Sequence, residues 1–201
     1  MEIILIILAV LAAVALVIWL GLRLQPAPFP PFPRPSQPSE TAPLPPGLPA
    51  PVERMYRKIY GERIPVIHSA VFTGRVQLSP FFRIPLQGRF RFIHDAGRSY
   101  RHYIEATFFG RPFLKVNERY LEGQSLFELP FGPPTQGPKL NQAANLGMWA
   151  ELFLLPSVFL TDPRVRWVAV DDQSALLVVP FDQGEETFIL RFDSSDSIRY
   201  A

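Results

Sequence analysis

The stretch LQGRFRFIHDAGRSYRHYIEATFF, residues 86–109, contains two segments of alternating character on either side of a turn. Residues 86–93 place Leu86, Phe90 and Phe92 on one side and polar side chains on the other, and residues 100–109 repeat the pattern. Asp-Ala-Gly at 95–97 is typical of a turn. A period of two predicts half-buried antiparallel strands joined as a hairpin.

Further segments on both sides of this hairpin extend the pattern. Period-two alternation also occurs in Val66–Leu78, Phe113–Glu122, Ser125–Phe131, Val165–Val170, Ala175–Phe181 and Thr187–Phe192. Residues 51–60 and 140–155 have the period of a helix instead, and Pro156 ends the second of them. We therefore predict an α+β fold in which a curved, half-barrel-like antiparallel sheet of about eight strands is covered by one or two helices.

An uncharged apolar run of twenty residues, Ile3–Leu22, begins the chain. A helix needs about 20 residues to cross the hydrocarbon of a bilayer. The run lacks the basic start and the small-residue cleavage site of a signal peptide, which is the alternative interpretation. We predict a transmembrane anchor over residues 1–25 of a single-pass membrane protein.

Residues 26–51 contain twelve prolines. Because proline fixes φ and removes a donor, we expect a disordered or polyproline linker that holds the domain, residues 52–201, several tens of ångströms from the bilayer. A ligand for a proline-recognising domain is the alternative. A stiff spacer suits a periplasm or cell wall, so we favour an extracytoplasmic domain, although Arg23 and Arg34 after the span favour the cytoplasm.

The composition narrows the classes of partner. The net charge is +2, and basic residues occur only in short groups such as Arg54, Arg57 and Lys58. We therefore predict no nucleic-acid partner. The chain has no cysteine, which excludes disulfides and thiolate metal sites. Seventeen phenylalanines are many for this length and suggest a wide apolar interior.

Several short motifs, in their order and spacing, resemble an uncharacterised bacterial family of membrane-anchored domains. They are Leu48–Val52 with Tyr56, Trp149-Ala150-Glu151 with Pro156, Val165-Arg166-Trp167 and Val170-Asp171-Asp172. The resemblance covers residues 48–201 and implies no assigned activity. Its members continue with several more strands, which implies a C-terminally incomplete domain here. In architecture alone, the strand–helix–strand order is similar to the half-barrels of lipoprotein carriers and related periplasmic lipid-binding proteins.

The residues show no motif for catalysis or metal binding. His68, His94 and His102 lack the spacing of metal ligands on a helix, so we predict no metal site, no catalytic residue and no cofactor. His68 and His102 fall on apolar strand faces, where we expect core histidines. The paired carboxylates at 171–172 and 185–186 fall in predicted turns.

The leading hypothesis is a non-catalytic module that binds an apolar, lipid-like ligand in a cavity between sheet and helix. The candidate lining residues are Phe72, Phe90, Phe92, Phe108, Trp149 and Trp167, with Glu151 as a carboxylate that could meet a ligand head group. Ordinary core packing is the alternative for the aromatics, and a solvent-facing position is the alternative for Glu151. Two other functions stay open: a structural or protein-interaction module of the cell envelope, and a lipid-active enzyme with Glu151, His68 and His102 in one cleft.

Overall fold

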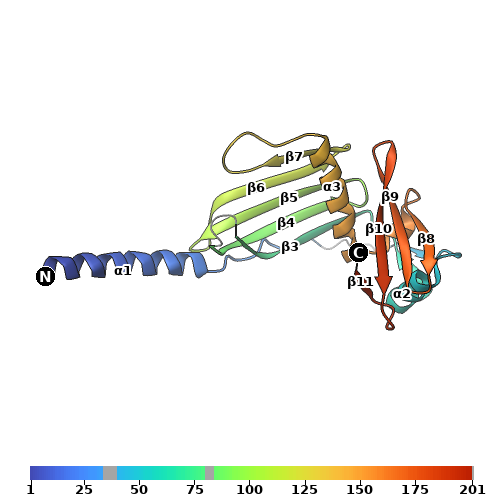
Figure 1. Cartoon of the computed structure of the whole chain (residues 1–201), viewed down its shortest axis with the longest axis horizontal. Coiled ribbons are helices and arrows are strands. Elements are labelled where there is room, and N and C mark those ends of the chain that lie inside the picture. Colours follow the sequence, from blue (N-terminus) through green and yellow to red (C-terminus); the bar gives the residue numbers. More distant parts are fainter. Residues whose placement is uncertain (34–39, 80–83, 201) are drawn as a thin grey trace.

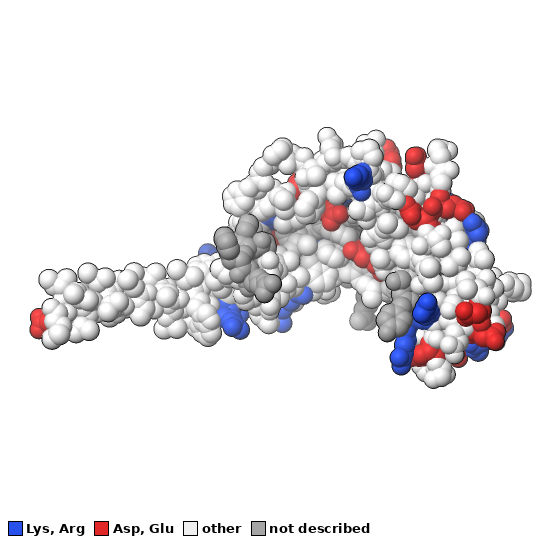
Figure 2. Space-filling view, viewed as in Figure 1, with Lys and Arg blue, Asp and Glu red and all other residues white. Residues whose placement is uncertain are grey.

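Helix α1 (Glu2–Arg23) extends away from the rest of the molecule in the computed structural model, which describes residues 1–33, 40–79 and 84–200 (Figure 1). Its surface carries no charge between its two ends (Figure 2). The helix has 22 residues and is long and apolar enough to cross a membrane. The chain therefore has one N-terminal helix that can anchor it as a single-pass protein.

Five antiparallel strands form the larger sheet, in the order β3-β4-β5-β6-β7. They are β3 (Ser69–Leu78), β4 (Leu86–Asp95), β5 (Ser99–Phe108), β6 (Arg111–Leu121) and β7 (Gln124–Glu128). The register places Phe92 opposite His102 and His102 opposite Glu118. Because alternate residues of a strand share a face, the even-numbered side chains of β4, β5 and most of β6 lie on one side of this sheet.

The remaining strands form a four-stranded sheet and a short ribbon. The four-stranded sheet has the order β11-β10-β9-β8, and β1 pairs with β2. The bounds are β1 (Thr41–Pro43), β2 (Arg63–Pro65), β8 (Arg166–Asp171), β9 (Ser174–Phe181), β10 (Gly184–Phe192) and β11 (Ile198–Tyr200). Helix α2 (Ala50–Tyr60) packs its apolar stripe of Val52, Met55 and Tyr56 against this smaller sheet.

Helix α3 (Pro138–Glu151) crosses one end of the larger sheet and lies between the two sheets (Figure 1). A 3-10 turn (Leu152–Leu154) and the short helix α4 (Val158–Thr161) then lead to the smaller sheet. One continuous core joins all of these elements, with Tyr100 from the larger sheet, Trp149 from α3 and Leu177 from the smaller sheet among its buried members. The two sheets are therefore held together through α3.

The expected fold class is confirmed: the sheets are antiparallel and open, and each strand expected from the sequence is present. The expected single sheet of about eight strands is wrong, because the strands divide into two sheets. The division follows α3, the 3-10 turn and α4, which carry the chain away from the edge strand β7. Hydrophobic periodicity predicts which face of a strand is buried, but it does not predict which other strands pair with that strand.

The last turn of α1 lies directly against the turn between β5 and β6. The backbone N–H of Phe109 donates to the carbonyl of Gly21 at 2.9 Å. Gly21 is buried, and a Cβ there would collide with the rings of Phe108 and Phe109. The larger sheet therefore contacts the end of the anchor directly. This contact differs from the expectation that the proline-rich segment separates the anchor from the domain.

The first part of the proline-rich segment follows the polar face of the larger sheet. Arg75 Nε donates to the carbonyl of Pro26 at 2.9 Å. The ring of Phe29 lies 5.9 Å from that of Tyr103 and under the guanidinium of Arg89. These arginines satisfy carbonyls that a polyproline helix leaves free, which explains why the segment lies on the sheet. Residues 34–39 of the expected linker lie outside the described part of the chain.

Candidate functional site

An apolar groove of about 520 Å³ lies on the face of the larger sheet that carries the even-numbered residues. It is lined by Leu78, Ser79, His102, Ile104, Ala106, Leu114, Val116, Glu118, Phe127, Leu129 and Pro130. Helix α3 covers only one end of this face, and no other helix among the described residues covers the rest of it (Figure 1). The volume falls within the roughly 300–1,000 Å³ of ligand pockets.

A second apolar depression, of about 490 Å³, lies between the end of the anchor and Leu114, a residue that it shares with the groove. Its lining consists of Leu22, Ile84, Leu86, Phe113, Leu114 and Phe131. Leu22 belongs to the last turn of α1, and Leu114 also lines the groove. The exposed rings of Phe113 and Phe131 extend this surface toward the solvent. Two neighbouring apolar depressions, which share Leu114, therefore lie between the end of the membrane helix and the sheet.

Three polar side chains converge where α3 meets the same face of the sheet. His94 lies on β4, His102 on the adjacent strand β5, and Glu151 is the last residue of α3. One carboxylate oxygen of Glu151 lies 2.8 Å from His94 Nε2 and 3.0 Å from His102 Nε2. Both histidines are buried, whereas the side chain of Glu151 is 32 % exposed. We call these three residues the His–His–Glu cluster.

The β-sheet register explains why the two histidines meet. His94 pairs with Tyr100, and Phe92 pairs with His102, so the histidines are diagonal neighbours on one face. Diagonal side chains in antiparallel sheets remain within reach of each other. The imidazole centroids are 5.5 Å apart, and the ring of Phe92 stacks on that of His102 at 3.9 Å.

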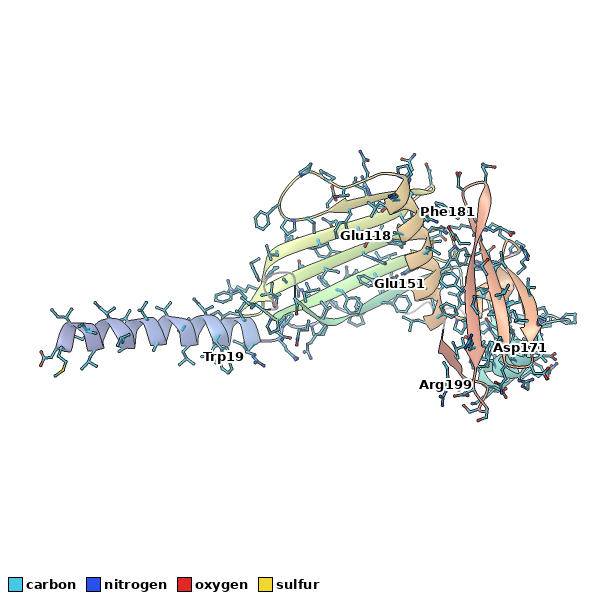
Figure 3. All side chains as sticks on the ribbon, viewed as in Figure 1. Trp19, Glu118, Glu151, Asp171, Phe181 and Arg199 are labelled. Carbon is cyan, nitrogen blue, oxygen red and sulfur yellow. The ribbon has the colours of Figure 1, made fainter. Side chains whose placement is uncertain are left out.

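Glu118 and Tyr100 surround His102 on its other side. Glu118 lies directly opposite His102 on β6, with a carboxylate oxygen 3.7 Å from Nδ1 of the imidazole. The hydroxyl of Tyr100 donates to the other oxygen of Glu118 at 2.7 Å. Figure 3 shows Glu118 and Glu151 near each other beside α3 and the sheet. His102 is thus placed between two carboxylates.

Mutual attraction shifts the protonation equilibria of these groups. Burial raises the pKa of Glu151, but His102 and His94 more than offset this and lower the pKa to about 2. Burial lowers the pKa of His102, and the carboxylates of Glu118 and Glu151 reverse that effect and raise it above its usual value. The pKa of Glu118 is lowered, chiefly by His102. The carboxylates of Glu118 and Glu151 therefore favour the charged form of His102.

The converging atoms lie at hydrogen-bonding distances, but the described residues do not orient them as hydrogen bonds. Neither ring nitrogen of His94, nor Nε2 of His102, nor the converging oxygen of Glu151 has a hydrogen-bond partner among the described residues. A buried polar atom without a partner costs about 1–3 kcal/mol. The cluster is therefore unusual for a purely structural feature.

Four of the residues predicted from the sequence lie together near this cluster. The ring of Phe72 contacts His94 edge-on at 5.7 Å, and Phe90 lies 4.7 Å from Phe92 on β4. Phe92 stacks on His102, and Glu151 belongs to the cluster itself. The larger sheet and α3 therefore bring Phe72, Phe90, Phe92 and Glu151 together around the two histidines. His102 lines the groove, whereas these four residues do not.

The other three predicted residues lie elsewhere. Phe108 packs against Phe109 and Gly21 at the end of α1. Trp149 is fully buried in the core between the sheets. Trp167 lies on β8 and contacts Tyr56 on the side of the smaller sheet. The structure does not join these aromatics to the groove.

Sequence reasoning assigned no functional role to His94 or Glu118. The expected strand ended at Ile93, although the period of two continues to His94 and places it on the face of Phe90 and Phe92. With the turn at 95–97, this period predicts that His94 and His102 are diagonal neighbours on adjacent strands. The placement of His68 on an apolar face is wrong: it lies before β3 with a side chain 79 % exposed, and His94 takes the position beside Glu151 and His102.

Comparison with known proteins identifies the family of the chain. A model of a family of unknown function, DUF6544, matches residues 38–200, so the chain belongs to that family. This confirms the resemblance to an uncharacterised family drawn from the motifs. No curated protein and no solved structure matches the chain. The similarity to lipoprotein carriers therefore stays a prediction.

Proposed function

We propose that this protein is a membrane-anchored, non-catalytic module that binds an apolar, lipid-like molecule in the groove of its larger sheet. The observation that carries the proposal is the pair of apolar depressions that share Leu114, because one reaches Leu22 of α1 and together they would form a path from the bilayer to the groove. A molecule leaving the bilayer along this path stays in contact with apolar side chains.

The polarity of the groove supports the same proposal. Ligand sites for small molecules are mostly apolar, with a few polar groups that fix orientation. Here Ile104, Ala106 and Val116 line the middle of the groove, and His102 and Glu118 lie at one end. Each methylene group of a bound chain contributes about 0.8 kcal/mol when it leaves water. An acyl chain would lie along the strands, and its polar end would meet His102 and Glu118.

We also propose that the domain lies on the extracytoplasmic side of the membrane. Twelve prolines in residues 26–51 favour this side as a spacer, although Pro26 and Phe29 lie against the sheet and Arg23 at the end of α1 favours the other side. The family match begins at residue 38 and excludes the anchor, so it leaves the orientation to experiment.

Photo-crosslinking of the full-length chain in nanodiscs tests the binding proposal. The nanodiscs contain a phospholipid with a diazirine near the end of one acyl chain, and mass spectrometry locates the crosslinked peptides. We expect adducts on β5 and β6, at or beside Ile104, Leu114 and Val116, in addition to those on α1. Adducts confined to α1 would contradict the proposal.

A lipid-active enzyme is the second candidate, and the His–His–Glu cluster is the observation that favours it. Histidine and carboxylate pairs can transfer protons in hydrolysis. The same nanodisc sample distinguishes the two functions, because a binding module leaves its lipid intact. Release of fatty acid or head group by the wild-type chain, and its absence with a Glu151→Gln variant, would favour the enzyme.

A further inference from the structure

We propose that His94, His102 and Glu151 form a binding site for a divalent transition metal ion of the zinc type. The proposal goes beyond lipid binding and does not depend on what occupies the groove. It rests on the geometry of the His–His–Glu cluster, on its unpartnered atoms and on the residues that surround it.

The donor set suits such an ion. Two imidazole nitrogens and one carboxylate oxygen make up a known type of three-residue zinc site, in which a fourth position is free for water or another ligand. Imidazole donors favour zinc and its neighbours, whereas calcium and magnesium prefer oxygen. The chain has no cysteine that would compete for the ion.

The separations between the donor atoms also suit an ion. Ligands at about 2.0–2.1 Å from tetrahedral zinc are roughly 3.3 Å apart. The oxygen of Glu151 lies 2.8 and 3.0 Å from the two Nε2 atoms, and all three donor atoms are within 4.8 Å of one another. An ion would lengthen the two shorter separations by a few tenths of an ångström, and it would draw the two imidazole nitrogens, which are within 4.8 Å of each other, toward 3.3 Å.

The unpartnered atoms of the cluster are the second observation that supports a metal ion. Both Nε2 atoms and the oxygen of Glu151 are buried and have no hydrogen-bond partner among the residues that the structure describes. An ion would satisfy the three atoms at once, since each supplies a lone pair to it when the histidines are neutral.

Neighbouring residues hold the donors in place. Histidines that bind metals usually direct their other nitrogen to a carboxylate or carbonyl. Glu118 lies 3.7 Å from Nδ1 of His102 and is itself held by the Tyr100 hydroxyl at 2.7 Å. Phe92 stacks on the imidazole of His102 and restricts its rotation. His102 also lines the groove. A ligand in the groove could therefore reach the fourth coordination position of the ion.

The test measures metal binding by the full-length chain in detergent, produced without a polyhistidine tag and stripped with a chelator. Titration with Zn²⁺ or Co²⁺ is followed by calorimetry and by the visible d–d absorption of Co²⁺. We expect one ion per chain with a Kd below about 1 μM, and a rise in Tm of roughly 5–10 °C at a hundredfold excess over Kd. A wild-type chain that binds neither ion would overturn the proposal.

Variants identify the ligands. Glu151→Gln keeps the shape of the partly exposed side chain, and we expect it to weaken binding at least 100-fold. Glu118→Gln should weaken binding about 10-fold, as for other residues that orient a ligand. His68→Gln is the matched control, because this exposed histidine lies outside the cluster, and its affinity should not change. Wild-type affinity in a folded Glu151→Gln variant, or loss of affinity in the control, would contradict the assignment.

Discussion

Replacement of Ile104 by lysine places a charge in the middle of the groove. Ile104 lies on the central strand β5, between Phe90 on β4 and Val116 on β6. Its side chain is half-buried, so the longer lysine can follow the groove surface and keep its ammonium in water while the groove is empty. The fold should therefore tolerate the change, whereas an acyl chain lying over this position should not.

The expected loss has two parts. The isoleucine contact with a bound chain contributes about 1 kcal/mol, which is about half of what full burial of such a side chain contributes. Covering or displacing the ammonium costs roughly 2 kcal/mol more, since a charge loses hydration beside an apolar chain. The sum is about 3 kcal/mol, which corresponds to a Kd raised on the order of 100-fold.

The assay titrates the full-length chain, held in amphipol, with a fatty acid that carries an environment-sensitive fluorophore. Ile189→Lys is the matched control, because it makes the same substitution at an exposed strand position of the smaller sheet. We expect weaker binding for Ile104→Lys and unchanged binding for the control, with similar Tm values for both. A folded Ile104→Lys variant whose Kd stays within about threefold of wild type would refute the placement of the ligand.

Three further predictions concern stability and orientation. Trp149→Ala should lower the free energy of unfolding by about 3–5 kcal/mol and the Tm by roughly 6–20 °C, because this side chain fills the core between the sheets; a loss below about 1 kcal/mol in denaturant titration would contradict that role. Burial raises the pKa of Glu105, but the Tyr103 hydroxyl and Arg89 more than offset this and lower it. Ionised Glu105 therefore stabilises the fold at pH values above the usual carboxyl pKa. Glu105→Gln should lower the free energy of unfolding by about 1–2 kcal/mol at pH 7 and by progressively less as the pH falls below about 4. An equal loss at pH 7 and pH 3 in thermal melts would be inconsistent with this pair. Because the chain has no cysteine, Gln183→Cys introduces a single thiol in an exposed turn, and a membrane-impermeant maleimide should label it on intact spheroplasts if the domain is extracytoplasmic; labelling only after lysis would place the domain in the cytoplasm.

The secondary structure follows closely from the sequence. The stripe of Val52, Met55 and Tyr56 predicts α2, and Pro156 limits the helical region that contains α3. Alternation predicts the strands because each buries one face. Local patterns were sufficient for these elements, since each depends on neighbours a few residues apart.

The arrangement of those elements was harder to predict. The division into two sheets depends on how α3, with Trp149 on its buried side, packs between them, and no local period encodes that contact. The His–His–Glu cluster depends on the β4–β5 register and on the position of the last residue of α3. The turn at 95–97 is enough to predict the β4–β5 register from the sequence. The position of Glu151 next to the two histidines depends on how α3 packs on the sheet, which the sequence pattern does not predict.

Native mass spectrometry of the full-length chain, extracted from cell membranes in a mild detergent, tests the central claim most directly. Comparison with Ile104→Lys separates a groove lipid from lipids around the anchor, because both chains have the same α1. We predict that the wild-type chain retains one lipid mass under conditions that remove detergent, and that Ile104→Lys does not. A bare wild-type mass, or the same lipid adduct on both chains, would contradict a lipid site in the groove.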